Sequence, residues 1–178
     1  MDKNLASNEA LENIFGRRST RAFTSKEISR EDLETIVAAA KCAPTARNRR
    51  LRKFTVVQNK EMLEKINAVL GKVLERENYN MYGATALVIC TDKQDNPFRV
   101  EDCACSLENM FLAAHSLKIG SVWINQFNGV CDHPEVRAIL DELNVPADHA
   151  VYGTAALGYG MIPKKAAFDF SEEVEWIL

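Results

Sequence analysis

One stretch of the chain, residues 100–117, limits the possible folds more than any other. Its apolar residues recur at helical spacing and spread over more than one stripe of the helix surface; they are Val100, Cys103, Ala104, Leu107, Met110, Phe111, Ala114 and Leu117. A helix that is apolar around so much of its circumference has to be largely buried. The pattern therefore predicts a fold packed around one central helix, with a second subunit as a candidate cover for part of it.

Shorter patterns on both sides of this helix predict further helices and strands. Ser29, with Asp32 three residues later, marks a helix start, and Pro44 limits how far that helix extends. Apolar periodicity predicts other helices at 8–15, 61–75 and 134–143, and apolar or β-branched runs predict strands at 54–57, 86–90, 121–124 and 151–157. No internal repeat or linker-like run interrupts them, so we expect a single domain over residues 1–178.

Charge and apolar content argue against several classes of protein. The 178 residues carry a formal net charge of −3, whereas a general nucleic-acid binder shows a basic face, so we expect no nucleic-acid partner. The longest apolar runs are too short to cross a bilayer, and no apolar core of a secretory signal follows Met1. We therefore expect no membrane contact and a cytoplasmic protein.

The five cysteines and three histidines do not form a metal-binding pattern. No Cys-x-x-Cys pair occurs, and His115, His133 and His149 are far apart in the sequence. An odd number of cysteines in a reducing compartment indicates free thiols. We therefore expect neither a structural disulfide nor a bound metal.

Five consecutive residues, Arg17-Arg18-Ser19-Thr20-Arg21, combine three guanidiniums with two hydroxyls just after the first predicted helix. Arginine forks bind phosphate in a bidentate manner, and hydroxyls add further short donors, so this cationic segment (residues 17–21) is a candidate site for a bound dianion. The alternative is that cations near a helix C-terminus complement its dipole and remain solvated. The pentapeptide alone leaves both interpretations open.

The C-terminal tail after Pro163 is long and amphipathic. Its large apolar residues are Phe168, Phe170, Val174, Trp176 and Ile177, which are unfavourable in water and have no obvious partner in so small a domain. An exchange of segments between two subunits would bury them. We therefore expect residues 163–178 to form an arm that reaches a partner subunit.

Several other polar residues allow two interpretations. The basic run 47–53 is either a solvated strand edge or the positive mouth of a cleft that attracts an anionic donor or acceptor. Asp102 is expected to cap the central helix or to complement its dipole. Asn109 and His115, on the same helix, are expected to be a satisfied buried polar group and a packing residue. Taken alone, Trp123 is best explained as a core aromatic.

Five segments of the chain occur in an order and spacing that coincidence does not explain. They are Arg-Arg-Ser-Thr-Arg-Ala-Phe at 17–23, Ala-Ala-Lys-Cys-Ala-Pro-Thr-Ala-Arg-Asn at 39–48, the helix pattern at 102–114, Ile-Gly-Ser-Val-Trp-Ile at 119–124, and Ala-Leu-Gly-Tyr at 156–159. Together they resemble the nitroreductase family of flavoenzymes, in a short, single-domain form. The resemblance implies an α+β fold with a mixed central sheet flanked by helices. It also implies an intertwined two-fold dimer with FMN in each of two interface clefts.

The resemblance also assigns cofactor-binding residues. The FMN phosphate would be held by Arg17, Arg18, Ser19 and Arg21, with Lys164 and Lys165 nearby. The flavin of the other subunit would be approached by Pro44, Thr45, Ala46 and Asn48. The ring would lie along Trp123, Ile124 and Asn125, where a backbone N–H can donate to flavin N5. No residue is expected to be catalytic, because the cofactor carries the chemistry and solvent can supply protons.

The implied activity is the reduction of small electron-poor acceptors, such as nitroaromatics or quinones, by NADH or NADPH through ping-pong hydride transfer at flavin N5. The alternatives are a family member specialised for another flavin reaction, such as reductive dehalogenation or enone reduction, and a non-catalytic flavin-binding or sensing dimer. Two departures from the family pattern bear on the acceptor. Residues 49–53 replace a common Gln-Pro-Trp continuation, and the short segment 91–98 leaves the cleft open or differently covered. The sequence selects neither the acceptor nor NADH over NADPH.

Overall fold

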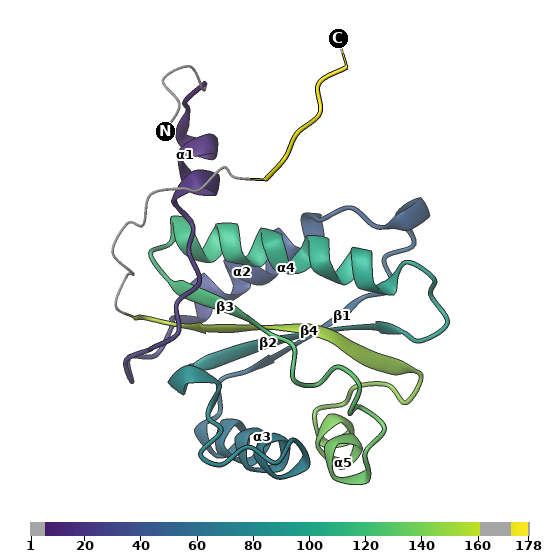
Figure 1. Ribbon diagram of the computed structural model, residues 1–178. Coiled ribbons are helices and arrows are strands. Elements are labelled where there is room, and N and C mark those ends of the chain that lie inside the picture. Colours follow the sequence, from purple (N-terminus) through teal and green to yellow (C-terminus); the bar gives the residue numbers. More distant parts are fainter. Residues whose placement is uncertain (1–5, 161–171, 178) are drawn as a thin grey trace.

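A four-stranded antiparallel sheet organises the protein, seen in a computed structural model that describes residues 6–160 and 172–177. The strands follow the order β1 (Lys53–Val57), β2 (Ala86–Lys93), β4 (His149–Gly158) and β3 (Gly120–Ile124) (Figure 1). All three neighbouring pairs are antiparallel. β1 and β3 are therefore the two edges of the sheet.

Helices cover both faces of this sheet. On one face lie α2 (Arg30–Cys42) and α4 (Arg99–Ser116), and on the other lie α3 (Lys60–Val73) and α5 (Pro134–Glu142) (Figure 1). Helix α1 (Glu9–Gly16) packs beside α4, and two short 3-10 turns, η1 (Ala46–Asn48) and η2 (Met81–Gly83), complete the described elements. Each face of the sheet has its own hydrophobic core.

The central helix predicted from residues 100–117 is α4, and its burial confirms the prediction. Its buried residues are Asp102, Cys103, Ser106, Leu107, Met110, Phe111 and Ala114. A Cβ on Gly153 of β4 would lie 2.4 Å from Leu107 Cδ1, so a glycine is needed there for the helix to approach the sheet. Val100, in the first turn of α4, is 53% exposed. The exposed positions further along α4 include Glu101, Cys105 and Glu108, so part of the helix surface is uncovered in the described residues.

The other predicted elements are present, with small differences in length. The Ser29 hydroxyl accepts a hydrogen bond from Asp32 N at 3.1 Å, which confirms the predicted start of α2. Asn109 Nδ2 donates to Ala39 O at 3.0 Å, so this polar group is satisfied and joins α4 to α2. Strand β2 continues to Lys93, past the predicted end at Cys90, because the register shifts there and pairing with β4 resumes.

The predicted α+β fold is confirmed, and the structure refines the expected mixed character of its sheet. All four strands are antiparallel, and within the described residues the parallel contribution is an isolated bridge between Ser19 and Ser121. No helix among these residues is both long and apolar enough to span a membrane. Of the predicted arm, residues 163–171 and 178 lie outside the described residues, whereas Val174, Trp176 and Ile177 are exposed. The arm and the dimer remain predictions.

Candidate functional site

The cationic segment (residues 17–21) follows α1 and passes along the beginning of β3. Thr20 N donates to Ser121 O at 2.9 Å, and Phe23 forms an antiparallel bridge with Gly160. Thr20 is only 5% exposed, and its side chain fills the space that a Cβ on Gly120 would need. These contacts fix the backbone of the segment against the sheet, so its side chains project from a rigid base.

The three arginines of this segment have different surroundings. Arg18 Nη1 donates to Phe15 O and to Arg17 O, both at 2.7 Å, so it complements the C-terminal end of α1. Arg17 Nε is buried and has no hydrogen-bond partner among the described residues, although Glu108 Oε1 lies 3.5 Å away. Arg21 is exposed. The helix-dipole interpretation therefore describes Arg18, whereas Arg17 retains an unsatisfied buried donor.

A histidine, His115, and a further cation, Lys118, lie close together at the C-terminal end of α4, near Arg17. A Cβ on Gly16 would lie 2.8 Å from His115 Nε2, so the imidazole packs directly on the end of α1, as expected for a packing residue. Burial lowers the pKa of His115, and Lys118, Arg17 and Arg18 lower it further. An unsatisfied Arg17 donor, a neighbouring serine hydroxyl and surrounding cations fit a phosphate monoester.

The loop of residues 43–50, called the η1 loop below, is held by internal hydrogen bonds. Thr45 O accepts from Asn48 N at 2.9 Å, and Thr45 Oγ1 accepts from Arg50 N at 3.2 Å. Asn48 Oδ1 accepts from Arg50 Nε at 2.9 Å. Arg47, Asn48 and Arg50 all have a positive φ, between 52° and 56°, which costs non-glycine residues conformational energy. This loop therefore needs anchors elsewhere in the chain.

Asp102 and Arg52 supply those anchors. Asp102 Oδ1 accepts from Ala46 N at 2.9 Å, and Asn96 Nδ2 donates to Asp102 Oδ2 at 3.4 Å. Arg52 donates from Nη2 to Ala43 O at 2.9 Å and from Nη1 to Asp102 O and Ser106 Oγ. Asp102 therefore lies at the start of α4, as expected, and also holds the η1 loop in place. The interpretation of 47–53 as a solvated edge is wrong for Arg52, whose guanidinium is bound inside the protein, whereas Arg49 and Arg50 are exposed.

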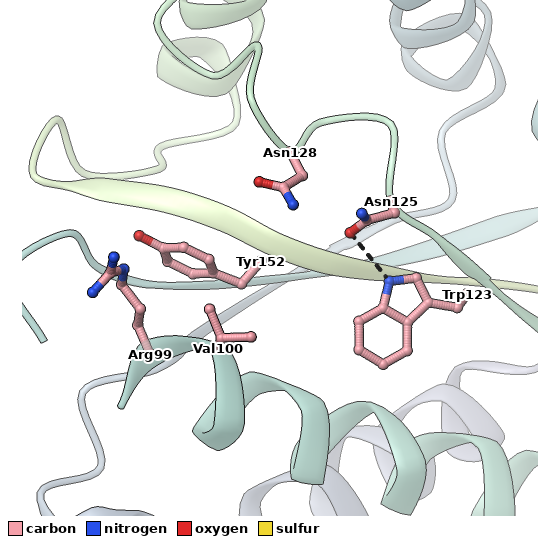
Figure 2. Close-up of a pocket in the computed structure, with 6 residues that line it drawn as sticks. All are labelled: Arg99, Val100, Trp123, Asn125, Asn128 and Tyr152. Carbon is pink, nitrogen blue, oxygen red and sulfur yellow. Dashed lines mark hydrogen bonds between the residues drawn. The ribbon is translucent and has the colours of Figure 1, made fainter. Parts of the chain in front are cut away.

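A cavity of about 520 Å³ lies where the N-terminal end of α4 meets β3 and β4 (Figure 2). Its lining residues are Arg99, Val100, Trp123, Asn125, Asn128 and Tyr152. Trp123 is 39% exposed and donates from Nε1 to Asn125 Oδ1 at 3.4 Å, so it is not the core aromatic that its sequence context alone suggested. The side chain of Ile124, in contrast, is buried in the core on the α3 and α5 side, which leaves its backbone as the part that can face a ligand.

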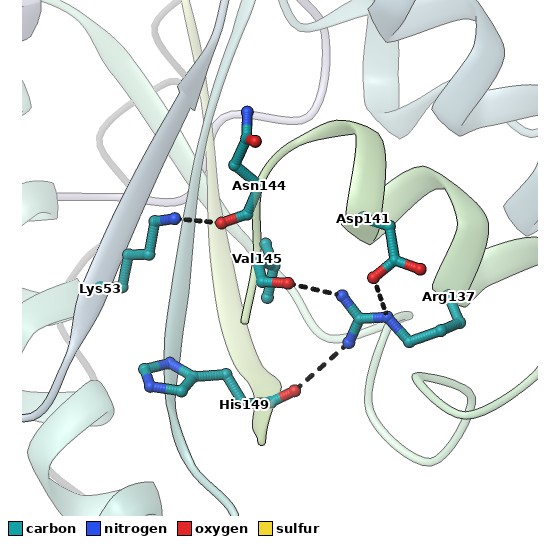
Figure 3. Close-up of polar contacts among 6 residues, drawn as sticks. All are labelled: Lys53, Arg137, Asp141, Asn144, Val145 and His149. Carbon is teal, nitrogen blue, oxygen red and sulfur yellow. Dashed lines mark hydrogen bonds and ion pairs between the residues drawn. The ribbon is translucent and has the colours of Figure 1, made fainter. Parts of the chain in front are cut away.

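Polar contacts fix the beginning of β4, the strand that carries Tyr152 (Figure 3). Arg137 of α5 donates from Nη2 to Val145 O at 2.8 Å and from Nη1 to His149 O at 3.5 Å. The Lys53 ammonium donates to the carbonyl of Asn144 on the other side of this turn. The position of Tyr152 in the cavity is thus set by contacts from α5 and β1.

The predicted cofactor-binding residues fall into separate groups in this chain. The cationic segment lies at the C-terminal end of α4 and the η1 loop at its N-terminal end (Figure 1). Within the described residues, no hydrogen bond or ion pair joins the η1 loop to the cationic segment or to Trp123–Asn125. Lys164 and Lys165 lie outside the described residues. Four cavity residues escaped sequence reasoning, namely Arg99, Val100, Asn128 and Tyr152.

The fold is that of an α+β protein, with a candidate anion site at the C-terminal end of α4 and a partly aromatic cavity at its N-terminal end. Residues 14–159 match the sequence model of the nitroreductase family, and the chain therefore belongs to this family of oxidoreductases, as the sequence predicted. An Archaeoglobus fulgidus protein with the provisional name NADH dehydrogenase/NAD(P)H nitroreductase is 35% identical over 158 residues, which is 85% of each chain.

Solved structures agree with this assignment. A nitroreductase from Bacteroides fragilis with bound FMN is 37% identical, with a TM-score of 0.84, and the match covers 96% of this chain and 100% of that one. A nitroreductase from Desulfitobacterium hafniense, 24% identical with a TM-score of 0.85 over 97% of this chain and all of its own, has the same fold.

Proposed function

We propose that this protein is an FMN-dependent oxidoreductase that uses NAD(P)H to reduce small electron-poor acceptors, such as nitroaromatics or quinones. The observation that carries this proposal is the match to the nitroreductase family over residues 14–159. The named donor of the Archaeoglobus fulgidus relative and the FMN bound to the Bacteroides fragilis relative support the two cofactors. The exposed Arg21, the Ser19 hydroxyl and the neighbouring Arg17, on a segment fixed by the hydrogen bond from Thr20 N to Ser121 O, support an FMN phosphate at that place.

Each group of residues has a distinct task in this proposal. Arg17, Ser19 and Arg21 hold the phosphate, and the backbone of Trp123–Asn125 lies along the ring. When bound, FMN supplies the capacity to accept a hydride from the nicotinamide and to pass electrons to an acceptor. The protein positions these partners. We assign no side chain a catalytic role, because the partly exposed cavity allows solvent to supply protons.

We further propose a homodimer in which the η1 loop of one copy approaches the flavin held by the other. Within the described residues, no hydrogen bond joins the η1 loop to Trp123 of the same chain, so the proposed contact of this loop is with the flavin of the second copy. The exposed Val174, Trp176 and Ile177 support an arm, residues 163–178, that covers the second copy. Five free cysteines and a nicotinamide donor support a cytoplasmic location.

The visible absorption spectrum of the purified protein, before and after anaerobic NADH or NADPH, tests the proposed function. We expect a yellow protein whose flavin band bleaches with at least one donor. A protein that stays yellow with both donors would instead be a flavin-binding or sensing dimer. A colourless protein that also fails to bind added FMN would contradict the proposal.

A further inference from the structure

The cavity beside Trp123 has an uneven distribution of charge. Of its six lining residues, Arg99 is the one with a charged side chain, and none of the six is acidic. Figure 2 shows Arg99 and Tyr152 together at one side of the cavity and Trp123 with Asn125 at the other. A cavity with a cation at one side and an indole at the other is suited to a flat ligand that carries a negative charge away from its ring.

Arg99 is held in position without using all its donors. Its Nη1 donates to Asn96 O at 3.0 Å, and its guanidinium carbon lies 5.7 Å from the centre of the Tyr152 ring. A guanidinium carries five N–H donors, so this arrangement leaves others for a ligand. Because the side chain is already ordered, binding an anion costs less conformational entropy than it would at a free surface arginine.

Tyr152 supplies a second donor at the same side. Burial raises the pKa of its hydroxyl, and the neighbouring Arg99 only partly opposes this effect. The group therefore remains a neutral hydroxyl at pH 7 and can donate a hydrogen bond to an anionic oxygen. Asn128, also in the lining, carries an amide that can donate as well.

The opposite side of the cavity offers an aromatic surface for a ring, and Val100 adds apolar surface between the two sides (Figure 2). Trp123 is 39% exposed and Val100 is 53% exposed, so both present side-chain surface that a planar ligand can cover. The Trp123 ring is oriented by its hydrogen bond to Asn125 and by Phe111, whose ring centre lies 6.2 Å away. Aromatic rings stack favourably on such a surface.

We propose that this cavity selects aromatic acceptors that carry a carboxylate or a similar anionic group, with the anion bound by Arg99 and Tyr152 and the ring placed against Trp123. This inference rests on the proposed function, since it names the substrate class of the same site. It makes Arg99 a residue that determines specificity. The electron-poor group of the acceptor then lies on the Trp123 side, where the flavin is expected.

Calorimetric titration of the oxidised, FMN-loaded protein tests binding without turnover. The probes are 4-nitrobenzoate and its neutral analogue 4-nitrobenzamide at pH 7. We expect the carboxylate to bind at least tenfold tighter than the amide. In Arg99→Gln this preference should disappear, and in Tyr152→Phe it should fall by a smaller factor. Equal affinities of the two probes for the unmodified protein would overturn the proposal.

Steady-state kinetics test the same selectivity during turnover. The ratio of kcat/KM for the carboxylate to kcat/KM for the amide should fall at least tenfold in Arg99→Gln. Arg99→Lys should retain part of the preference, because an ammonium keeps the charge without the planar fork. Arg30→Gln is the matched control, since Arg30 is an exposed arginine in the first turn of α2 that does not line the cavity. Its ratio should remain that of the unmodified protein.

Two kinetic results would contradict this inference without contradicting the proposed function. An unchanged ratio in Arg99→Gln would overturn it. So would an equal loss with both acceptors accompanied by a shifted flavin spectrum, because Arg99 would then act on the flavin. If the protein binds no FMN or no donor reduces it, the proposed function fails, whereas titration of the flavin-free protein with the two probes still tests the cavity.

Discussion

The two ends of helix α4 differ in how they treat charge. At the N-terminal end, Asp102 and Arg52 are bound by backbone and side-chain partners within the protein. At the C-terminal end, Arg17, His115 and Lys118 gather with a single carboxylate, Glu108, facing Arg17. Asp102 and Arg52 thus join separate segments of the fold, although Arg52 Nε has no hydrogen-bond partner among the described residues. At the other end, Arg21 and Lys118 are exposed, and clustered cations favour an external anion. We therefore treat the N-terminal end of α4 as structural and propose the C-terminal end as the ligand-binding end.

The largest effect is expected from removing cations at the ligand-binding end. In the double variant Arg17→Ala/Arg21→Ala, the FMN affinity should fall by about 100-fold or more, since two charge-assisted contacts to the phosphate are lost. Flavin content measured from the visible absorbance, with the oligomeric state checked by gel filtration, tests this. Riboflavin, which lacks the phosphate, is the control ligand, and its affinity should change little. An unchanged flavin content would refute the phosphate assignment.

The next effect is expected from disturbing the structural end. Asp102→Ala removes the acceptor of Ala46 N and of Asn96 Nδ2 and should lower the free energy of unfolding by about 2–3 kcal/mol. Urea denaturation of the flavin-free protein measures this loss. Glu31→Ala is a suitable comparison, because Glu31 is an exposed acidic residue in the first turn of another helix, α2. If both variants lose the same stability, the distinction between the two ends does not hold.

A smaller effect, of opposite sign, is expected at Lys118. This residue has φ +62° at the end of α4, where glycine is the favoured residue. Lys118→Gly should raise the free energy of unfolding of the flavin-free protein by about 1 kcal/mol, since the left-handed conformation is less costly for glycine. Thermal unfolding measures the change. A lower stability would mean that the lysine side chain contributes more than its backbone strain costs.

The smallest effect concerns pH. The pKa values of His115 and His149 are both lowered in the folded protein, mainly by burial. The unfolded chain therefore binds more protons, and stability should decrease as the pH falls below about 6.5. Bound FMN should raise the pKa of His115, because a phosphate then stands among its cations, and should leave that of His149 unchanged. NMR titration of the two imidazoles distinguishes them; equal shifts would contradict the comparison.

Local patterns in the sequence predicted most of the fold. The apolar residues of α4 and the Ser29 cap each depend on neighbours a few positions away, so their period and spacing were visible. The exact extent of β2 could not be predicted from local patterns, because its continuation to Lys93 depends on pairing with β4, far along the chain. The antiparallel arrangement of all four strands likewise arises from long-range contacts.

The candidate site was predictable where it consists of contiguous motifs and not where it depends on packing. The family resemblance is confirmed, and the cationic segment was found from its composition. Arg99 and Tyr152 come from distant segments that meet only in the folded protein, so no spacing linked them. Arg52 was indistinguishable from its neighbours in a basic run, because its burial depends on where Asp102 and Ala43 lie.

The place of Arg99 in α4 also bears on how such a protein can diversify. Arg99 is the first residue of the helix, outside the set of α4 residues that fill the core. A substitution at this position is therefore expected to leave the core packing of α4 largely intact. Under the proposed role of Arg99, acceptor preference could then change by substitution there without first requiring extra stability.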